Sequence, residues 1–98
     1  MAVRNWFDLT TGEIESAIGH SIAILPVAAV EQHGPHLPLS TDVTIAEGYL
    51  AKLAELDASD LDILVLPVQS IGKSDEHDAF PGTLTLTAET ALRAWGEI

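Results

Sequence analysis

The sequence predicts an α/β fold whose sheet is mainly parallel. Two apolar runs, residues 21–30 and 61–68, each fit a buried strand, and a helical pattern over residues 42–56 lies between them. The runs also match each other, because Ile-Leu-Pro-Val at residues 24–27 corresponds to Val-Leu-Pro-Val at residues 65–68. Two strands joined by one helix form a right-handed βαβ unit, so both strands are expected to run in the same direction.

The elements before the second run have local signals of their own. Thr10 and Thr11 precede a short helix over residues 12–18, which Gly19 would end. The run over residues 21–30 hardly alternates, which predicts a strand buried on both faces, although Pro26 removes one backbone donor.

The later elements follow the same logic. Asp42 is expected to cap the helix over residues 42–56, whose apolar residues recur at helical spacing. Residues 83–86 alternate like a short extended piece, and Thr87 caps a final helix with Leu92 and Trp95 on one face. The sequence therefore predicts one βαβ unit followed by a further helix.

Composition excludes several classes of function. The net charge is −11 with only four Lys and Arg residues, so nucleic acid is not an expected partner. The chain has no Cys, which excludes disulfides, thiolate ligands and a Cys nucleophile. No apolar stretch approaches the roughly 20 residues of a membrane span, and the N-terminus lacks a signal-peptide core. We expect no membrane partner and a cytoplasmic location.

Candidate metal ligands follow the first apolar run. Glu31 and His33 share one side of an extended chain, because side chains alternate with period two, and Asp42 at a helix start can reach the same point. Carboxylates and imidazoles are the ligands of hydrolytic divalent metals, and this set accepts zinc, manganese or iron. We predict a metal at Glu31, His33 and Asp42, and rank His36 below them. Each residue also has a plainer interpretation, as a helix cap or a hydrogen-bonded loop imidazole.

A second polar loop follows the second apolar run. It carries Ser74, Glu76 and His77, and parallel neighbouring strands would bring it to the same edge of the sheet. These side chains are candidates to contact a substrate, to hydrogen-bond the metal ligands, or to form a surface pair, and their spacing does not decide among the three.

Both loops resemble those of one enzyme family. Residues 24–42 read ILPVAAVEQHGPHLPLSTD, and residues 72–84 read GKSDEHDAFPGTL. These segments are similar, in order and separation, to the first two motifs of the creatininase (creatinine amidohydrolase) family. The resemblance covers most of the chain from about residue 22 to residue 86.

The resemblance implies a three-layer α/β/α fold and a centre of two ions, zinc or manganese. It implies that Glu31 binds one metal, that His33 binds the other and that Asp42 bridges them. Family members hydrolyse cyclic amides or other non-peptide C–N bonds, and they include a peptidase of redox-cofactor maturation. They are commonly hexameric, so the resemblance also implies a homo-oligomer and a small amide substrate.

The resemblance also implies an incomplete site. The family's remaining ligands, a His and a Glu, fall beyond residue 98, so residues 1–98 are expected to form the N-terminal part of one domain. We expect the 98-residue chain alone to be inactive. Two alternatives remain: a non-catalytic remnant that binds a metal or a partner, and a structural α/β domain in which the acids are helix caps.

Overall fold

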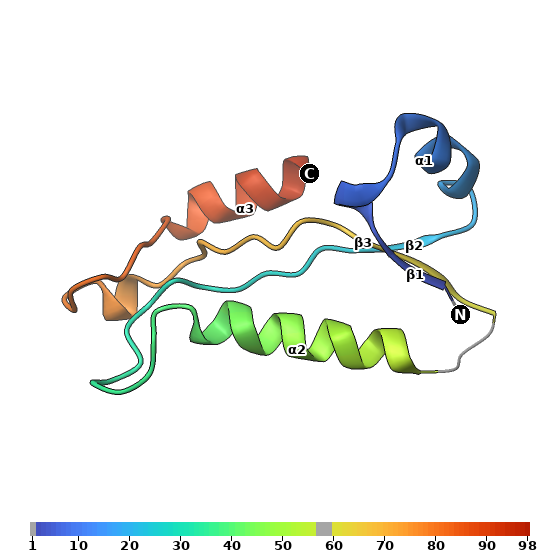
Figure 1. Cartoon of the computed structure of the whole chain (residues 1–98). Helices are drawn as coiled ribbons and strands as arrows, with labels where there is room; N and C mark the ends of the chain where they lie inside the picture. The colour runs from blue at the N-terminus through green and yellow to red at the C-terminus, as the bar shows by residue number, and fades with distance from the viewer. Residues whose placement is uncertain (1, 57–59) are drawn as a thin grey trace.

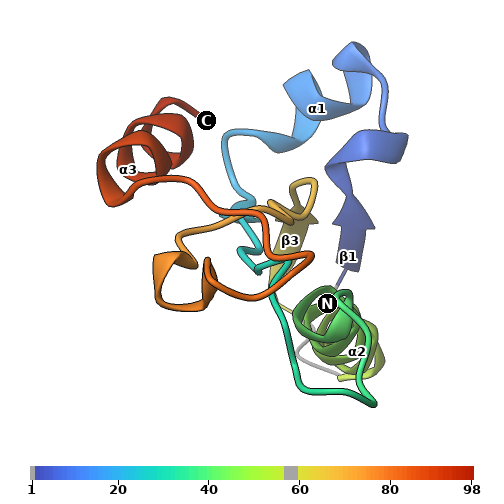
Figure 2. The ribbon, with the colours of Figure 1, turned by 90° about the vertical axis from the view of Figure 1, so that its left-hand side faces the viewer.

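The computed structural model describes residues 2–56 and 60–98 of the chain. In chain order its elements are β1 (Ala2–Asn5), η1 (Trp6–Asp8), α1 (Thr11–Ala17), β2 (Ile22–Ile24), α2 (Thr41–Glu55), β3 (Asp62–Val65), η2 (Asp75–His77) and α3 (Ala88–Glu97). Helix α2 lies along one side of the strands, and α1 and α3 lie on the other side (Figures 1 and 2). The predicted α/β class is confirmed.

The three strands form one parallel sheet in the order β1-β3-β2. The predicted βαβ unit is confirmed, because β2 and β3 are parallel neighbours joined through α2. Strand β1 was not predicted, since Ala2–Asn5 carries no apolar run and becomes a strand by pairing with β3. The central strand β3 supplies most of the core, with Ile63, Leu64 and Val65 buried.

The prediction that the first apolar run is buried on both faces was wrong. Strand β2 covers only Ile22–Ile24, and 49% of Ile22 is exposed. The physical reason is the strand order, which leaves β2 at an edge of the sheet within the described part of the chain. Pro26 and Pro67, which lack an N–H, follow β2 and β3 and reduce the later pairing to the isolated bridge between Val27 and Gln69.

The predicted threonine caps of α1 and α3 are confirmed, although α1 begins at Thr11, one residue before the predicted start. The Thr10 side chain accepts a hydrogen bond from the Glu13 N–H in a capping box, and the Thr87 side chain accepts one from the Thr90 N–H. In α3, however, the buried residue is Ala91, whereas 72% of Leu92 is exposed.

The prediction that Asp42 caps its helix was also wrong. Helix α2 starts at Thr41, and its N-cap residue is Ser40, whose side chain makes no capping hydrogen bond with the described residues. Asp42 instead stands in the first turn, where its negative charge is favourable beside the helix N-terminus. Within the described ranges, no helix has the length and apolar character needed to cross a bilayer.

Candidate metal centre

The extended segments that follow β2 and β3 run side by side away from the sheet (Figure 1). Backbone hydrogen bonds hold them together: the Ala28 N–H donates to the Gln69 oxygen at 2.9 Å, and the Gln69 N–H donates to the Pro26 oxygen at 2.9 Å. The second segment returns to the first at Leu84, whose N–H donates to the Val30 oxygen at 2.8 Å. Both polar loops therefore meet beyond the carboxyl ends of neighbouring parallel strands, where α/β sheets place their ligands.

At this meeting point the structure brings three predicted ligands together. One ligand atom from each of Glu31, His33 and Asp42 lies within 4.8 Å of the other two, and all three residues are half-buried. The chain turns back between them, with an antiparallel bridge from His33 to Leu37 and a left-handed Gly34 (φ 79°). The first turn of α2 then returns Asp42 to His33.

The hydrogen bonds of His33 fit a metal ligand. Its Nδ1 lies 3.0 Å from the Glu31 carbonyl oxygen, and because a carbonyl only accepts, Nδ1 carries a proton. That bond leaves Nε2 facing the Asp42 carboxylate, with Nε2 and Oδ1 3.2 Å apart. A backbone carbonyl holding one ring nitrogen while the other faces the ion is the usual arrangement of a metal-binding His.

The same contacts raise the pKa of His33. The main cause is the hydrogen bond to the Glu31 carbonyl, and the negative charges of Asp42 and Glu31 add to it. Both effects favour a positive charge at Nε2, where the lone pair of a neutral ring would face an anionic oxygen. A proton or a metal cation at Nε2 satisfies this position, so these residues fit a divalent ion.

A second group shares Glu31 with the first. Ligand atoms of Glu31, Glu76 and His77 lie within 4.8 Å of one another, and His77 Nε2 is 3.7 Å from Glu31 Oε2. Lys73 forms ion pairs within this loop, since its Nζ lies 2.7 Å from Asp75 Oδ1 and 3.1 Å from Glu76 Oε2. The pKa of Lys73 is raised by these carboxylates, chiefly Asp75, and the Lys73 ammonium in turn lowers the pKa of Asp75.

The structure places the other two predicted site residues, His36 and Ser74, in different surroundings. His36 is exposed in the loop and belongs to neither group. Ser74 is fully buried: its N–H donates to Thr85 Oγ1 at 2.8 Å, and its Oγ has no hydrogen-bond partner among the described residues. A role for Ser74 in substrate binding stays a prediction.

Gln32 is a site residue that the sequence reasoning missed. Its N–H donates to Thr83 Oγ1 at 3.1 Å, and its side-chain nitrogen lies 2.9 Å from His77 Nδ1, so it joins both loops. The available signal was its place between Glu31 and His33, since a polar amide there needs partners when it is half-buried.

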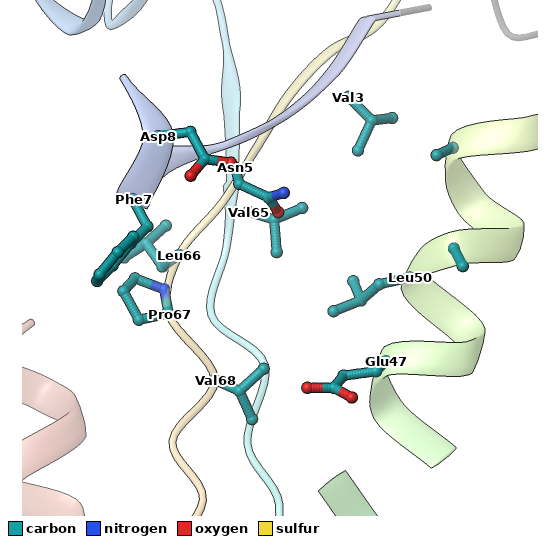
Figure 3. Close-up of a pocket in the computed structure, with 12 residues that line it drawn as sticks. Val3, Asn5, Phe7, Asp8, Glu47, Leu50, Val65, Leu66, Pro67 and Val68 are labelled. Carbon is teal, nitrogen blue, oxygen red and sulfur yellow. The ribbon is translucent and has the colours of Figure 1, made fainter. Parts of the chain in front are cut away.

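A separate cavity of about 510 Å³ lies between α2 and the strands, and Figure 3 shows its lining. Most of the lining is apolar, including Val3, Val65 and Leu50, and its carboxylates are Asp8 and Glu47. No His lines it, and it contains none of Glu31, His33 and Asp42. The cavity is therefore not the centre that the two polar loops form.

Comparison with known proteins identifies the family. A family model described as Creatininase: Creatinine amidohydrolase matches residues 7–98. The chain belongs to the creatininase family. The relationship predicted from the two loop motifs is confirmed, and it extends over almost the whole chain.

Curated relatives in this family carry the names of hydrolases. A mycofactocin precursor peptide peptidase of Mycolicibacterium smegmatis is 42% identical over 67 residues, covering 66% of this chain and 27% of the relative. The creatinine amidohydrolase of Pseudomonas putida is 34% identical over 90 residues, covering 85% of this chain and 33% of the relative. The chain thus spans about a third or less of the length of these relatives.

Solved structures agree with the fold. A creatininase mutant described as Zn-Zn type matches with a TM-score of 0.72 at 32% identity, covering 88% of this chain and 34% of that one. A creatininase mutant complexed with creatine matches with a TM-score of 0.72 at 30% identity, over the same 88% and 34%. The creatininase-like α/β fold predicted for this chain is therefore confirmed.

Proposed function

We propose that this chain supplies part of the metal site of a creatininase-family hydrolase that cleaves the C–N bond of an amide. The observation that carries the proposal is the convergence of Glu31, His33 and Asp42, with their ligand atoms within 4.8 Å of one another. Two carboxylates and an imidazole form a donor set for a hydrolytic divalent metal.

Each residue of the set has a distinct part in holding the ion. Glu31 and Asp42 supply negative charge, and His33 supplies the Nε2 lone pair while its Nδ1–H donates to the Glu31 carbonyl oxygen. A divalent metal bound here supplies Lewis acidity, which polarises a carbonyl and lowers the pKa of a water molecule. Zinc or manganese is the predicted metal, and a set of two carboxylates and an imidazole also accepts iron. The pair of ions that the resemblance implies stays a prediction.

The substrate class is an amide of small size. The relatives support this class, because a creatinine amidohydrolase and a precursor peptide peptidase both act on amide-type C–N bonds by their names. The narrower prediction, a cyclic or other non-peptide amide, stays a prediction. The homo-oligomer implied by the resemblance and the cytoplasmic location expected from the sequence stay predictions as well.

We also propose that catalysis requires more residues than these 98. Glu31, His33 and Asp42 offer three donors, whereas one catalytic zinc uses about three protein ligands and a pair of ions needs more. The relatives are about three times as long as the segment that matches them. The metal-loaded 98-residue chain is expected to show no amidase activity, and measurable turnover of a small amide would refute this expectation.

Metal titration of the purified chain tests the site itself. Isothermal titration with Zn²⁺ and Mn²⁺ should show binding to the native chain and at least a tenfold weaker affinity for Asp42→Asn, which loses one anionic ligand. Glu15→Gln is the matched control, because it removes one negative charge at an exposed position of α1. Equal affinities for the three proteins would refute the site, and a native chain without metal affinity would favour the structural α/β interpretation.

A further inference from the structure

The Gln32 side chain connects the two candidate ligand groups. Its Oε1 lies 3.0 Å from the Gly34 backbone nitrogen, and its Nε2 lies 2.9 Å from His77 Nδ1. These contacts place one amide between a backbone N–H of the first loop and an imidazole of the second. The contact with Gly34 therefore determines which end of the Gln32 amide faces His77.

The direction follows from what each group can do. A backbone N–H only donates, so the Gln32 atom facing Gly34 must be the oxygen, and the atom facing His77 must be the NH₂ group. An NH₂ group only donates, so His77 Nδ1 must accept. A neutral His77 then carries its proton on Nε2.

The surrounding backbone holds this arrangement in place. Gly34 donates its N–H to Gln32 Oε1, and it adopts φ 79°, a left-handed conformation that few other residues tolerate. The Gln32 N–H is held by Thr83 Oγ1, and the His77 N–H donates to the Ser74 oxygen at 2.9 Å. Both ends of the amide contact are thus fixed by the main chain.

We propose that Gln32 is a positioning residue that holds His77 as the Nε2–H tautomer. His77 then presents a proton, and not a lone pair, to the Glu31 carboxylate, whose Oε2 lies 3.7 Å from Nε2. His33 has the opposite tautomer, with Nδ1–H on the Glu31 carbonyl and the Nε2 lone pair toward Asp42. At Nε2, therefore, His33 offers a lone pair and His77 offers a proton.

This difference separates the two groups that share Glu31. Resting here on the proposed function, Glu31, His33 and Asp42 would hold the metal, whereas His77 directs its Nε2 proton toward the Glu31 carboxylate from outside the ligand set. The group formed by Glu31, Glu76 and His77 lacks an imidazole lone pair on its inner side. His77 is thus excluded as a ligand of that same ion in the native hydrogen-bond network.

Nitrogen NMR of the metal-free chain reads the tautomers directly. Long-range proton–nitrogen spectra, recorded well above the ordinary imidazole pKa, distinguish a protonated from an unprotonated ring nitrogen, and His77→Ala assigns the signals. We expect the Nε2–H pattern for His77 and the Nδ1–H pattern for His33. An Nδ1–H pattern for His77 in the native chain would overturn the proposal.

Substitutions at Gln32 test whether this residue sets the pattern. Gln32→Glu places an acceptor at His77, so Nδ1 should gain a proton, and Gln32→Met should leave a mixture of tautomers. Gln69→Glu is the control, because the Gln69 amide donates to the Pro67 oxygen elsewhere, and its spectrum should match the native one. Unchanged His77 signals in both Gln32 variants would refute the positioning role, while the signals of the other imidazoles report that each variant is folded.

Zinc addition separates this proposal from the proposed function. Zn²⁺ should shift His33 Nε2 and leave the His77 Nε2 proton in place. No response at His33 would contradict the metal site while the tautomer result for His77 stands. Loss of the His77 Nε2 proton on adding zinc would instead support metal binding and overturn the exclusion of His77 from the ligand set.

Discussion

Gly72 is the residue whose substitution tests the packing of the two loop segments most sharply. It is buried, and a Cβ added there would lie 2.7 Å from the Ala28 carbonyl oxygen and 3.7 Å from Trp95 Cζ2. Real Cβ atoms essentially never approach another atom closer than 3.0 Å, so the backbone must move in Gly72→Ala. That movement is opposed on both sides, because the Ala28 N–H is bonded to Gln69 and the Gly72 oxygen accepts from Leu86.

The size of the effect follows from two opposing contributions. Overpacking of this kind costs about 1–3 kcal/mol, and the lower entropy of an unfolded chain with Ala offsets about 0.4–1 kcal/mol. We expect Gly72→Ala to lower the free energy of unfolding by about 1–2 kcal/mol. Gly48→Ala is the matched control, since Gly48 lies inside α2 and, apart from the backbone of that helix and the two chain neighbours, no atom of the described residues lies within 4 Å of the added Cβ. This substitution should raise stability by about 0.5–1 kcal/mol.

Urea unfolding followed by far-ultraviolet circular dichroism measures both changes. The two variants should shift the midpoint in opposite directions with an unchanged slope, because neither alters the surface exposed on unfolding. A Gly72→Ala protein as stable as Gly48→Ala would refute the close approach of the two segments.

Three further predictions follow from other contacts. Asp62 accepts hydrogen bonds from Ser21 and Arg4, and these partners, Ser21 most of all, lower its pKa. The Asp62 carboxylate therefore stabilises the fold above its unfolded pKa of about 3.9, and this contribution is lost as the pH falls through the lower pKa of the folded state. Asp62→Asn should therefore be less stable than the native chain at neutral pH, with a difference that shrinks in acid, and a difference that grew in acid would contradict this sign. The pKa of His33 is raised, and a metal binds only the neutral form of its ring. The affinity for Zn²⁺ should therefore fall about tenfold per pH unit below that pKa and level off above it. An affinity that did not change in titrations from pH about 5 to 8 would contradict the role of His33 as a ligand. Ser74→Ala should leave the urea midpoint nearly unchanged, since the buried hydroxyl has no partner among the described residues, whereas a loss above about 1 kcal/mol would indicate a hydrogen bond.

The sequence predicted the parallel arrangement because its signals are local. The apolar runs and the helical spacing between them suffice to place β2, α2 and β3 in one βαβ unit. Thr10 and Thr87 predicted two helix starts because a capping hydroxyl acts on its own first turn.

The fold features that the sequence did not predict depend on strands that are distant in the sequence. Ala2–Asn5 becomes a strand only through its register with β3, and the exposure of Ile22 depends on which strand lies at the edge. Asp42 was predicted as the N-cap, but the N-cap is Ser40 and Asp42 lies in the first turn of α2. The residue types of the candidate site could be predicted, but the link from Gln32 to His77 spans 45 residues and depends on the folded loops.

The metal affinities of His33→Ala and His36→Ala test the central claim most directly. The two imidazoles stand three residues apart in the same loop, yet only His33 faces Asp42, while His36 is exposed outside both ligand groups. Zn²⁺ titration should show at least a tenfold loss of affinity for His33→Ala and native affinity for His36→Ala. Equal affinities for the two variants, or a larger loss for His36→Ala, would contradict a metal centre at Glu31, His33 and Asp42.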